Sequence, residues 1–158
     1  MLTDVPKYDE NGKLIISSVN LKVVDFGIFG SISGIRLENV NFGSLRFMAP
    51  ELLQGDIKST TKIDIWSLGL MLHAMVFGFL PFNANERNAL EQQILTDEIE
   101  YKNLKKLKTS SIKNEVRRAL NIMLKKTSDE LIDLIEKMLT KDPEQRIDNL
   151  SIFEHPWL

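Results

Sequence analysis

The longest hydrophobic stretch of the chain lies between residues 63 and 79, where apolar side chains occupy every face of a helix. A helix that is apolar all round is typical of a protein core. Charges stand only at its start, at Lys62 and Asp64, and His73 lies inside it. The pattern therefore predicts a buried helix that ends at Gly78, with His73 as a core residue rather than a catalytic one.

Shorter helical patterns follow. Residues 83–95 predict an amphipathic helix, residues 102–126 contain a weaker helical pattern, and a short last helix is expected before His155-Pro156-Trp157. Thr127 to Glu130 has the form of a capping box, in which Thr127 caps the helix and Glu130 reaches back to a free backbone N–H. The helix that it opens is predicted from apolar residues spaced i, i+3, i+4 and i+7: Leu131, Leu134, Ile135 and Met138.

The N-terminal part has a different pattern. Residues 13–16 and 21–24 are apolar and β-branched and predict two short strands, while residues 9–12 have turn chemistry. Residues 28–48 carry glycine, serine and asparagine without a sustained period, which predicts a long and functional loop. The expected fold is mainly α, with a short two-stranded β element at the N-terminus.

Composition limits the function classes. With 158 residues, 43% of them hydrophobic and 27% charged, the chain fits one globular domain. It has no cysteine, no secretory signal and no apolar run long enough to span a membrane, so we expect an intracellular, cytoplasmic protein without a transmembrane segment. A net charge of -2 argues against a nucleic-acid partner. Trp66 and Trp157 are expected to anchor the core.

One segment departs from this charge balance. Residues 102–126 hold nine lysines and arginines against one acid, Glu115, so the segment carries +8 and the remainder of the chain -10. Two interpretations stay open. The basic insert, about residues 102–127, is either a solvated surface or a docking site for a regulatory protein or an anionic surface.

Six sequence elements occur in one order and at workable spacings. They are Asp25-Phe26-Gly27, Ala49-Pro50-Glu51, Asp64-Ile65-Trp66-Ser67-Leu68-Gly69, Leu80-Pro81-Phe82, Lys141-Asp142-Pro143-Glu144-Gln145-Arg146-Ile147 and His155-Pro156-Trp157. In this order they resemble the C-terminal lobe of the eukaryotic serine/threonine protein kinases over essentially the whole chain. The last part, with residues 94–101 and 129–158, is similar to the calcium/calmodulin-dependent group and its kinase-kinase branch. The resemblance implies a protein-kinase-like C-terminal lobe.

The resemblance also implies an activation segment over residues 25–51 and the use of ATP and Mg²⁺. Asp25 would be the Mg²⁺ ligand, because a carboxylate is a hard oxygen ligand, and Phe26 and Gly27 would complete the nucleotide side of the site. Ser44 takes the place of the family's threonine and keeps its hydroxyl, and Asp64 would hold the catalytic loop.

Glu51 and Arg146 are implied to form a buried structural ion pair, since arginine binds a carboxylate through two parallel hydrogen bonds. The alternative for these two residues is a pair of ordinary surface charges.

Two kinase motifs are missing from the sequence. Neither a glycine-rich loop nor the His-Arg-Asp catalytic loop occurs, so no catalytic base is present among these residues. We therefore expect residues 1–158 to be part of an ATP-dependent kinase that phosphorylates serine or threonine of protein substrates, and to be inactive alone. The alternative function is a non-catalytic, kinase-like module that docks protein partners.

Overall fold

The computed structural model describes residues 7–12, 22, 42–55, 60–99, 101 and 127–158. The chain divides into two compact units, residues 1–34 and 35–158. In the first unit the turn predicted over residues 9–12 is present: Gly12 N–H donates to the Asp9 carbonyl at 3.0 Å, and Gly12 has a φ of +74°. Of the two strands predicted beside it, over residues 13–16 and 21–24, all but Lys22 lie outside the described residues.

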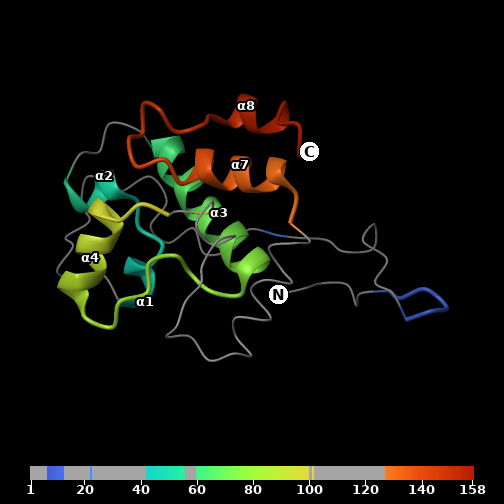
Figure 1. Cartoon of the computed structure of the whole chain (residues 1–158), viewed down its shortest axis with the longest axis horizontal. Helices are drawn as coiled ribbons and strands as arrows, with labels where there is room; N and C mark the ends of the chain where they lie inside the picture. The colour runs from blue at the N-terminus through green and yellow to red at the C-terminus, as the bar shows by residue number, and fades with distance from the viewer. Residues whose placement is uncertain (1–6, 13–21, 23–41, 56–59, 100, 102–126) are drawn as a thin grey trace. The chain divides into compact units, whose positions relative to one another are not determined.

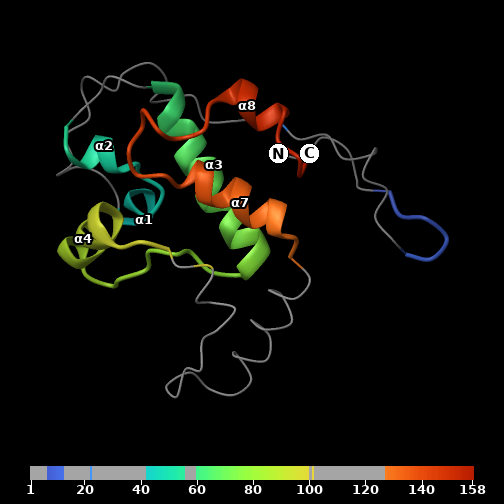
Figure 2. The ribbon, with the colours of Figure 1, turned by 45° about the horizontal axis from the view of Figure 1, so that its top comes forward.

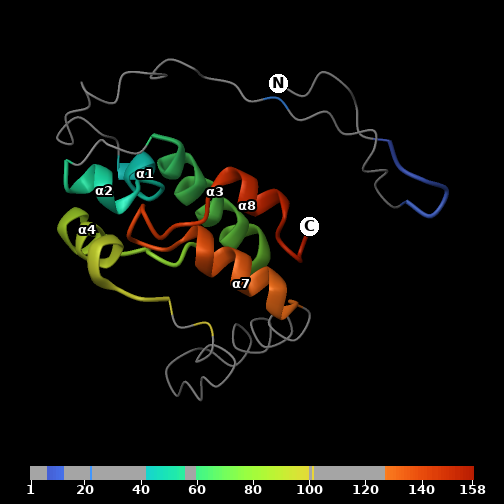
Figure 3. The same ribbon diagram turned by 90° about the horizontal axis from the view of Figure 1, so that it is seen from above.

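Within the described ranges the second unit is helical. Its helices are α1 (Phe42–Leu45), α2 (Pro50–Leu53), α3 (Thr60–Phe77), α4 (Arg87–Thr96), α7 (Asp129–Met138) and α8 (Asn149–Phe153). The long helix α3 has α7 along one side, and the short helices α1 and α2 lie with α4 toward one end (Figure 1). Figure 2 and Figure 3 show the same neighbours from two further directions. None of the described helices is both long and apolar enough to cross a membrane.

The core lies between α3 and α7. Ile65 of α3 packs with Leu134 and Met138 of α7, and all three side chains are buried. The i, i+3, i+4 spacing predicted for α7 thus faces α3. Trp66 is fully buried, as predicted, whereas Trp157 is 39% exposed and does not anchor the core. That prediction was wrong because the last residues of the chain lie on the surface of the helical unit.

One face of α3 is exposed, which corrects the prediction of a helix buried all round. Leu68, Met71 and Met75 are 49%, 44% and 76% exposed. They recur at i, i+3 and i+7 and so form one stripe along the helix. An apolar sequence shows that a face is suited to burial, but burial also needs a neighbouring element, and the described residues supply none there.

α3 and α7 approach closely at Gly69. A methyl group built on Gly69 would lie 2.9 Å from both Met138 Cβ and Leu139 Cδ2. Contacts this short are forbidden, so any larger residue pushes the two helices apart.

We therefore expect Gly69→Ala to lower the free energy of unfolding by about 1–3 kcal/mol, as other overpacked cores do. This loss opposes the gain of about 1 kcal/mol that alanine brings to a helix interior. Urea unfolding measures it. Met75→Ala on the exposed stripe of α3 is the control, with an expected change below about 0.5 kcal/mol. A Gly69→Ala protein more stable than wild type would contradict the close packing.

The starts of two helices differ from the sequence prediction. Ser128, not Thr127, caps α7, since its hydroxyl accepts a hydrogen bond from Leu131 N–H at 3.2 Å. The predicted capping box was therefore wrong: two adjacent hydroxyl residues both suit a cap, and the structure uses the second. α4 begins at Arg87 rather than near residue 83. The side chain of Gln93 accepts hydrogen bonds from the backbone N–H groups of residues 83 and 84 and holds them outside the helix.

The segment that leads to Ala49-Pro50-Glu51 is partly helical, although residues 28–48 were predicted to be a loop. α1 makes one turn and is followed by hydrogen bonds from Phe47 N–H to the Ser44 carbonyl and from Met48 N–H to the Leu45 carbonyl, each 3.1 Å long. Leu45 is fully buried. An apolar anchor of this kind lets a short segment without a periodic pattern close into a turn.

Candidate functional site

The end of the predicted activation segment is fixed to α3. Leu45 and Ala49 are fully buried, and the Ser67 hydroxyl on α3 donates a hydrogen bond of 2.9 Å to the Phe47 carbonyl. Ser44 lies in α1 with an exposed side chain. The backbone from α1 to α2 is thus held in place, while the hydroxyl of Ser44 remains accessible.

Glu51 and Arg146 form a buried ion pair. Arg146 Nη1 lies 2.7 Å from Glu51 Oε1, and Arg146 Nη2 lies 2.9 Å from Glu51 Oε2. The two residues are 3% and 1% exposed. This is the bidentate geometry in which the planar guanidinium matches a carboxylate. Of the two sequence interpretations, the structure shows the pair rather than two surface charges.

Every N–H of the Arg146 guanidinium has an acceptor. Besides Glu51, Nη1 donates to the Lys62 carbonyl at 2.7 Å, Nη2 to the Lys141 carbonyl at 3.1 Å and Nε to the Thr140 carbonyl at 2.8 Å. A guanidinium has five such donors. Arg146 therefore joins three segments: the start of α2, the start of α3 and the loop after α7.

Aromatic rings complete this centre. The Arg146 guanidinium carbon lies 5.1 Å from the centre of the Trp66 ring, and Trp66 stacks on Phe82 with centroids 5.9 Å apart. Lys62 on α3 donates a hydrogen bond back to the Arg146 carbonyl. The positive charge is thereby held between one carboxylate and one indole face, an arrangement that compensates a buried cation.

The other predicted site residues lie apart from this pair or outside the description. Asp64 is on α3 with an exposed side chain, and the described residues give it no hydrogen-bond partner. Asp25, Phe26 and Gly27 lie outside the described residues, as does the basic segment 102–126. Within the described ranges no three His, Asp or Glu side chains gather closely enough to share a metal ion.

Each of the two histidines contacts another residue of the helical unit through a ring nitrogen. His73 is fully buried, its Nδ1 lies 2.9 Å from the Phe79 carbonyl, and burial lowers the pKa of His73 to about 4 despite that hydrogen bond. His155 Nε2 lies 3.0 Å from Asp133 Oδ2. Two hydrogen bonds lower the pKa of Asp133. The one from Lys137 has the larger effect, and the one from His155 has the smaller effect.

Sequence reasoning missed the residues that surround the ion pair. Lys62, Thr140 and Lys141 take part through backbone carbonyls, which every residue type carries, so no pattern could have found them. Trp66 was recognised as a core residue but not as the ring that covers Arg146.

The chain is similar in sequence to known proteins. Residues 9–158 match the family model of the protein kinase domain. The chain is 31% identical over 157 residues to the serine/threonine-protein kinase TOS3 of Saccharomyces cerevisiae, covering 92% of this chain and 27% of the relative. It is 30% identical over 138 residues to calcium-dependent protein kinase 21 of Arabidopsis thaliana, covering 87% of this chain and 22% of the relative.

A solved structure shows the same fold. The autoinhibited serine kinase domain of the giant muscle protein titin has a TM-score of 0.53 and 25% identity, over 73% of this chain and 30% of that one. The chain thus spans less than a third of the length of these relatives. The family match over residues 9–158 and the identity to serine/threonine kinases lead to one conclusion: the chain belongs to the protein kinase domain family.

Proposed function

We propose that residues 1–158 form the C-terminal lobe of an ATP-dependent protein kinase that transfers the γ-phosphate of ATP to serine or threonine of protein substrates. The observation that carries the proposal is the Glu51–Arg146 centre. Phosphoryl transfer requires mainly that the protein position its groups. Arg146 ties the end of the segment 25–51 to the helical core through Glu51 and three backbone carbonyls.

In this proposal each predicted residue has one task. Asp25 supplies a carboxylate ligand for Mg²⁺, and Phe26 and Gly27 shape the backbone beside the nucleotide. Bound Mg²⁺ would neutralise the charge of the nucleotide phosphates. Ser44, exposed at the end of the fixed segment, faces the substrate side with its hydroxyl, and Asp64, exposed on α3, accepts backbone N–H groups of a catalytic loop.

The 158-residue chain alone should not transfer phosphate, because a catalytic base and most of the nucleotide site are missing from its sequence. The test incubates the purified chain with radiolabelled ATP, Mg²⁺ and a serine-containing acceptor protein such as casein. We expect incorporation equal to that of the Asp25→Asn variant. Incorporation well above that of Asp25→Asn would show that the chain is competent by itself and would contradict this part of the proposal.

A longer polypeptide that includes the coding sequence upstream of Met1 tests the parent activity. There we expect phosphate transfer, and Asp25→Asn should reduce it by about a hundredfold or more, since metal ions stabilise the transition state by several kcal/mol. Glu154→Gln, a change at an exposed residue, is the control and should leave transfer unchanged. A longer polypeptide that transfers no phosphate would favour a non-catalytic module that docks protein partners. The role of segment 102–126 in binding a regulatory protein or an anionic surface stays a prediction.

A further inference from the structure

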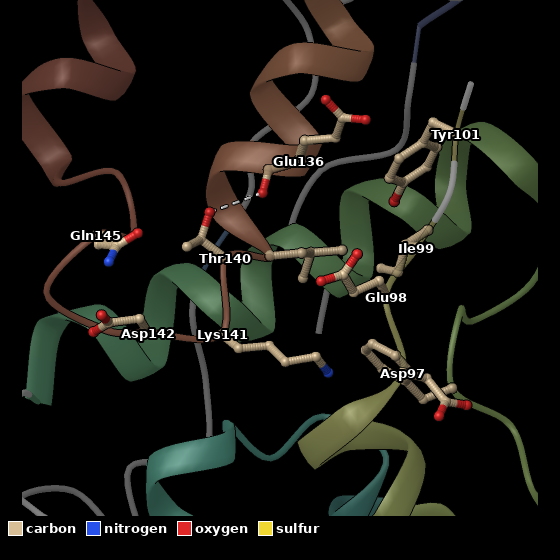
Figure 4. Close-up of a pocket in the computed structure, with 11 residues that line it drawn as sticks. Asp97, Glu98, Ile99, Tyr101, Glu136, Thr140, Lys141, Asp142 and Gln145 are labelled. Atoms are coloured by element: carbon tan, nitrogen blue, oxygen red, sulfur yellow. Dashed lines mark hydrogen bonds between the residues drawn. The ribbon is translucent and has the colours of Figure 1, made fainter. Parts of the chain in front are cut away.

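A cavity of about 370 Å³ lies between the C-terminal ends of α4 and α7. Its wall combines charged and aromatic side chains from the segments that follow these helices, from Glu136 in α7 and from Phe82 before α4 (Figure 4). The charged and phenolic groups that matter are Asp97, Glu98, Glu136, Asp142, Lys141 and Tyr101. The cavity adjoins the Glu51–Arg146 centre through Thr140 and Lys141, and neither Ser44 nor Asp64 lines it.

The cavity has an excess of negative charge. Four of these groups are carboxylates and one is an ammonium, and neither Glu98 nor Glu136 makes an ion pair within the described part of the chain. The ammonium of Lys141 donates to the carbonyls of Gln93 and Ile94 and lies 4.7 Å from the centre of the Phe82 ring. It also interacts with the charges of Asp97 and Glu98, but one cation does not balance four carboxylates. Both helices also direct their C-terminal ends, which carry partial negative charge, toward this region.

A second and independent feature is the hydroxyl of Tyr101. The residue is 1% exposed, and its hydroxyl has no hydrogen-bond partner among the residues that the structure describes. In Figure 4 that hydroxyl points from the Tyr101 ring toward the side of the cavity where Glu98 lies. Burial, and then the charge of Glu136, raise the pKa of Tyr101, so the phenol is neutral and can both donate and accept. A buried polar group without a partner calls for an explanation, and a ligand that donates to this oxygen supplies one.

The apolar part of the wall comes from Phe82, Ile99 and Leu139, and Thr140 and Gln145 add uncharged polar groups. A metal ion does not suit this site, because no three of the described acids gather closely enough to share one. A long side chain with an aliphatic stem and a cationic tip fits both parts of the wall. The planar guanidinium, with five donors, can contact separate carboxylates and the phenol at once.

We propose that this cavity is a docking site for a basic peptide segment of a partner protein, with an arginine side chain inserted between Glu98, Glu136 and Tyr101. The stem of the arginine packs on the apolar wall, and its guanidinium donates to the two carboxylates and to the hydroxyl of Tyr101. Docking requires neither nucleotide nor phosphate transfer, so it is independent of the proposed enzymatic function.

The test measures fluorescence anisotropy of a labelled peptide, Gly-Ser-Arg-Gly-Arg-Ser-Gly, titrated with the 158-residue chain at low ionic strength. The matched peptide has citrulline at both arginine positions, which keeps the shape and removes the charge. We expect the arginine peptide to bind about tenfold or more tightly than the citrulline peptide, and its affinity to fall as salt is added. Equal binding of the two peptides would overturn the proposal.

Charge-matched variants locate the site. Glu98→Gln/Glu136→Gln should weaken binding of the arginine peptide about tenfold. Glu86→Gln/Glu154→Gln, which removes the same charge outside the cavity, should leave it nearly unchanged. Tyr101→Phe should weaken it less than the double change does. Equal losses in the two double variants would show attraction by net charge alone and would overturn the site.

One more variant tests the source of the ligand. Replacing the lysines and arginines of the segment 102–126 with glutamine should not raise the affinity for the arginine peptide. A rise of about tenfold or more would mean that the chain's own basic segment fills the cavity, and it would overturn the proposal of a partner protein. Circular dichroism of every variant, compared with wild type, ensures that a loss of binding is read only from folded protein.

Discussion

Arg146→Met is expected to lower the free energy of unfolding by about 3–5 kcal/mol, the usual cost of leaving one partner of a buried ion pair without the other. The change leaves the carboxylate of Glu51 buried at 3% exposure without its cation. It also removes the donors that serve the carbonyls of Lys62, Thr140 and Lys141. Urea unfolding followed by tryptophan fluorescence measures the loss; both Trp66, which lies against Arg146, and Trp157 contribute to the signal.

Two further variants separate the buried charge from other effects. Arg87→Met removes the half-exposed partner of Glu91, a pair 3.3 Å apart within one helix, and should cost at most about 1 kcal/mol. In Glu51→Gln/Arg146→Met no charge is left stranded, so this double variant should be more stable than Arg146→Met alone. A double variant that loses as much as the sum of its single changes would show that the two side chains do not interact.

Acidification between pH 6.5 and 4 is expected to destabilise the protein through His73 by about 3 kcal/mol. The pKa of His73 is lowered from 6.5 to about 4 in the folded protein, mainly because the ring is buried. In this pH range the unfolded chain therefore takes up a proton that the folded protein does not. Stability is full above pH 6.5 and falls as the pH decreases toward 4.

The surroundings of His73 explain why the charged ring is unfavourable. Phe77, Phe79 and Tyr101 surround it with ring centroids 4.6, 5.4 and 5.6 Å away. Its Nδ1 donates to the Phe79 carbonyl, but its Nε2 has no partner within the described residues. A proton added at Nε2 would thus be buried without an acceptor.

His73→Phe isolates this contribution from that of the carboxylates, which titrate in both proteins. Urea unfolding of wild type and His73→Phe at pH 7 and pH 4.5 should show that wild type loses about 2–3 kcal/mol more on acidification. NMR titration of the His73 ring gives the folded pKa directly. Identical pH dependence of the two proteins, or a folded pKa near 6.5, would disprove the assignment.

The sequence predicted the helical frame where a hydrophobic pattern was long. α3 and α7 were recognised because their apolar residues recur over more than two turns, and Leu134, Ile135 and Met138 are buried as expected. α1 was missed because a four-residue helix is too short for any period to emerge. The exposed stripe of α3 was missed because the hydrophobic pattern does not show which faces of a helix will pack against another element.

The candidate site, like the fold, could be predicted from the sequence only in part. The resemblance to kinases named Glu51 and Arg146, and the structure brings them together. It could not name the backbone carbonyls around the guanidinium, because their positions depend on how three segments meet. Tyr101 carried no signal either, because a single tyrosine beside a basic segment looks ordinary in a sequence. Only the structure shows that its hydroxyl is buried without a partner in the described part of the chain.

The spacing of the ion pair along the chain has a consequence for the order of folding. Glu51 and Arg146 are 95 residues apart, so their contact closes a long loop and must wait until α3 and α7 have met. Contacts formed after the rate-limiting step change the unfolding rate and leave the folding rate almost unaltered. The contact of the Arg146 guanidinium with Glu51 should therefore form after the transition state of folding. In stopped-flow experiments the loss of Arg146 should appear as faster unfolding.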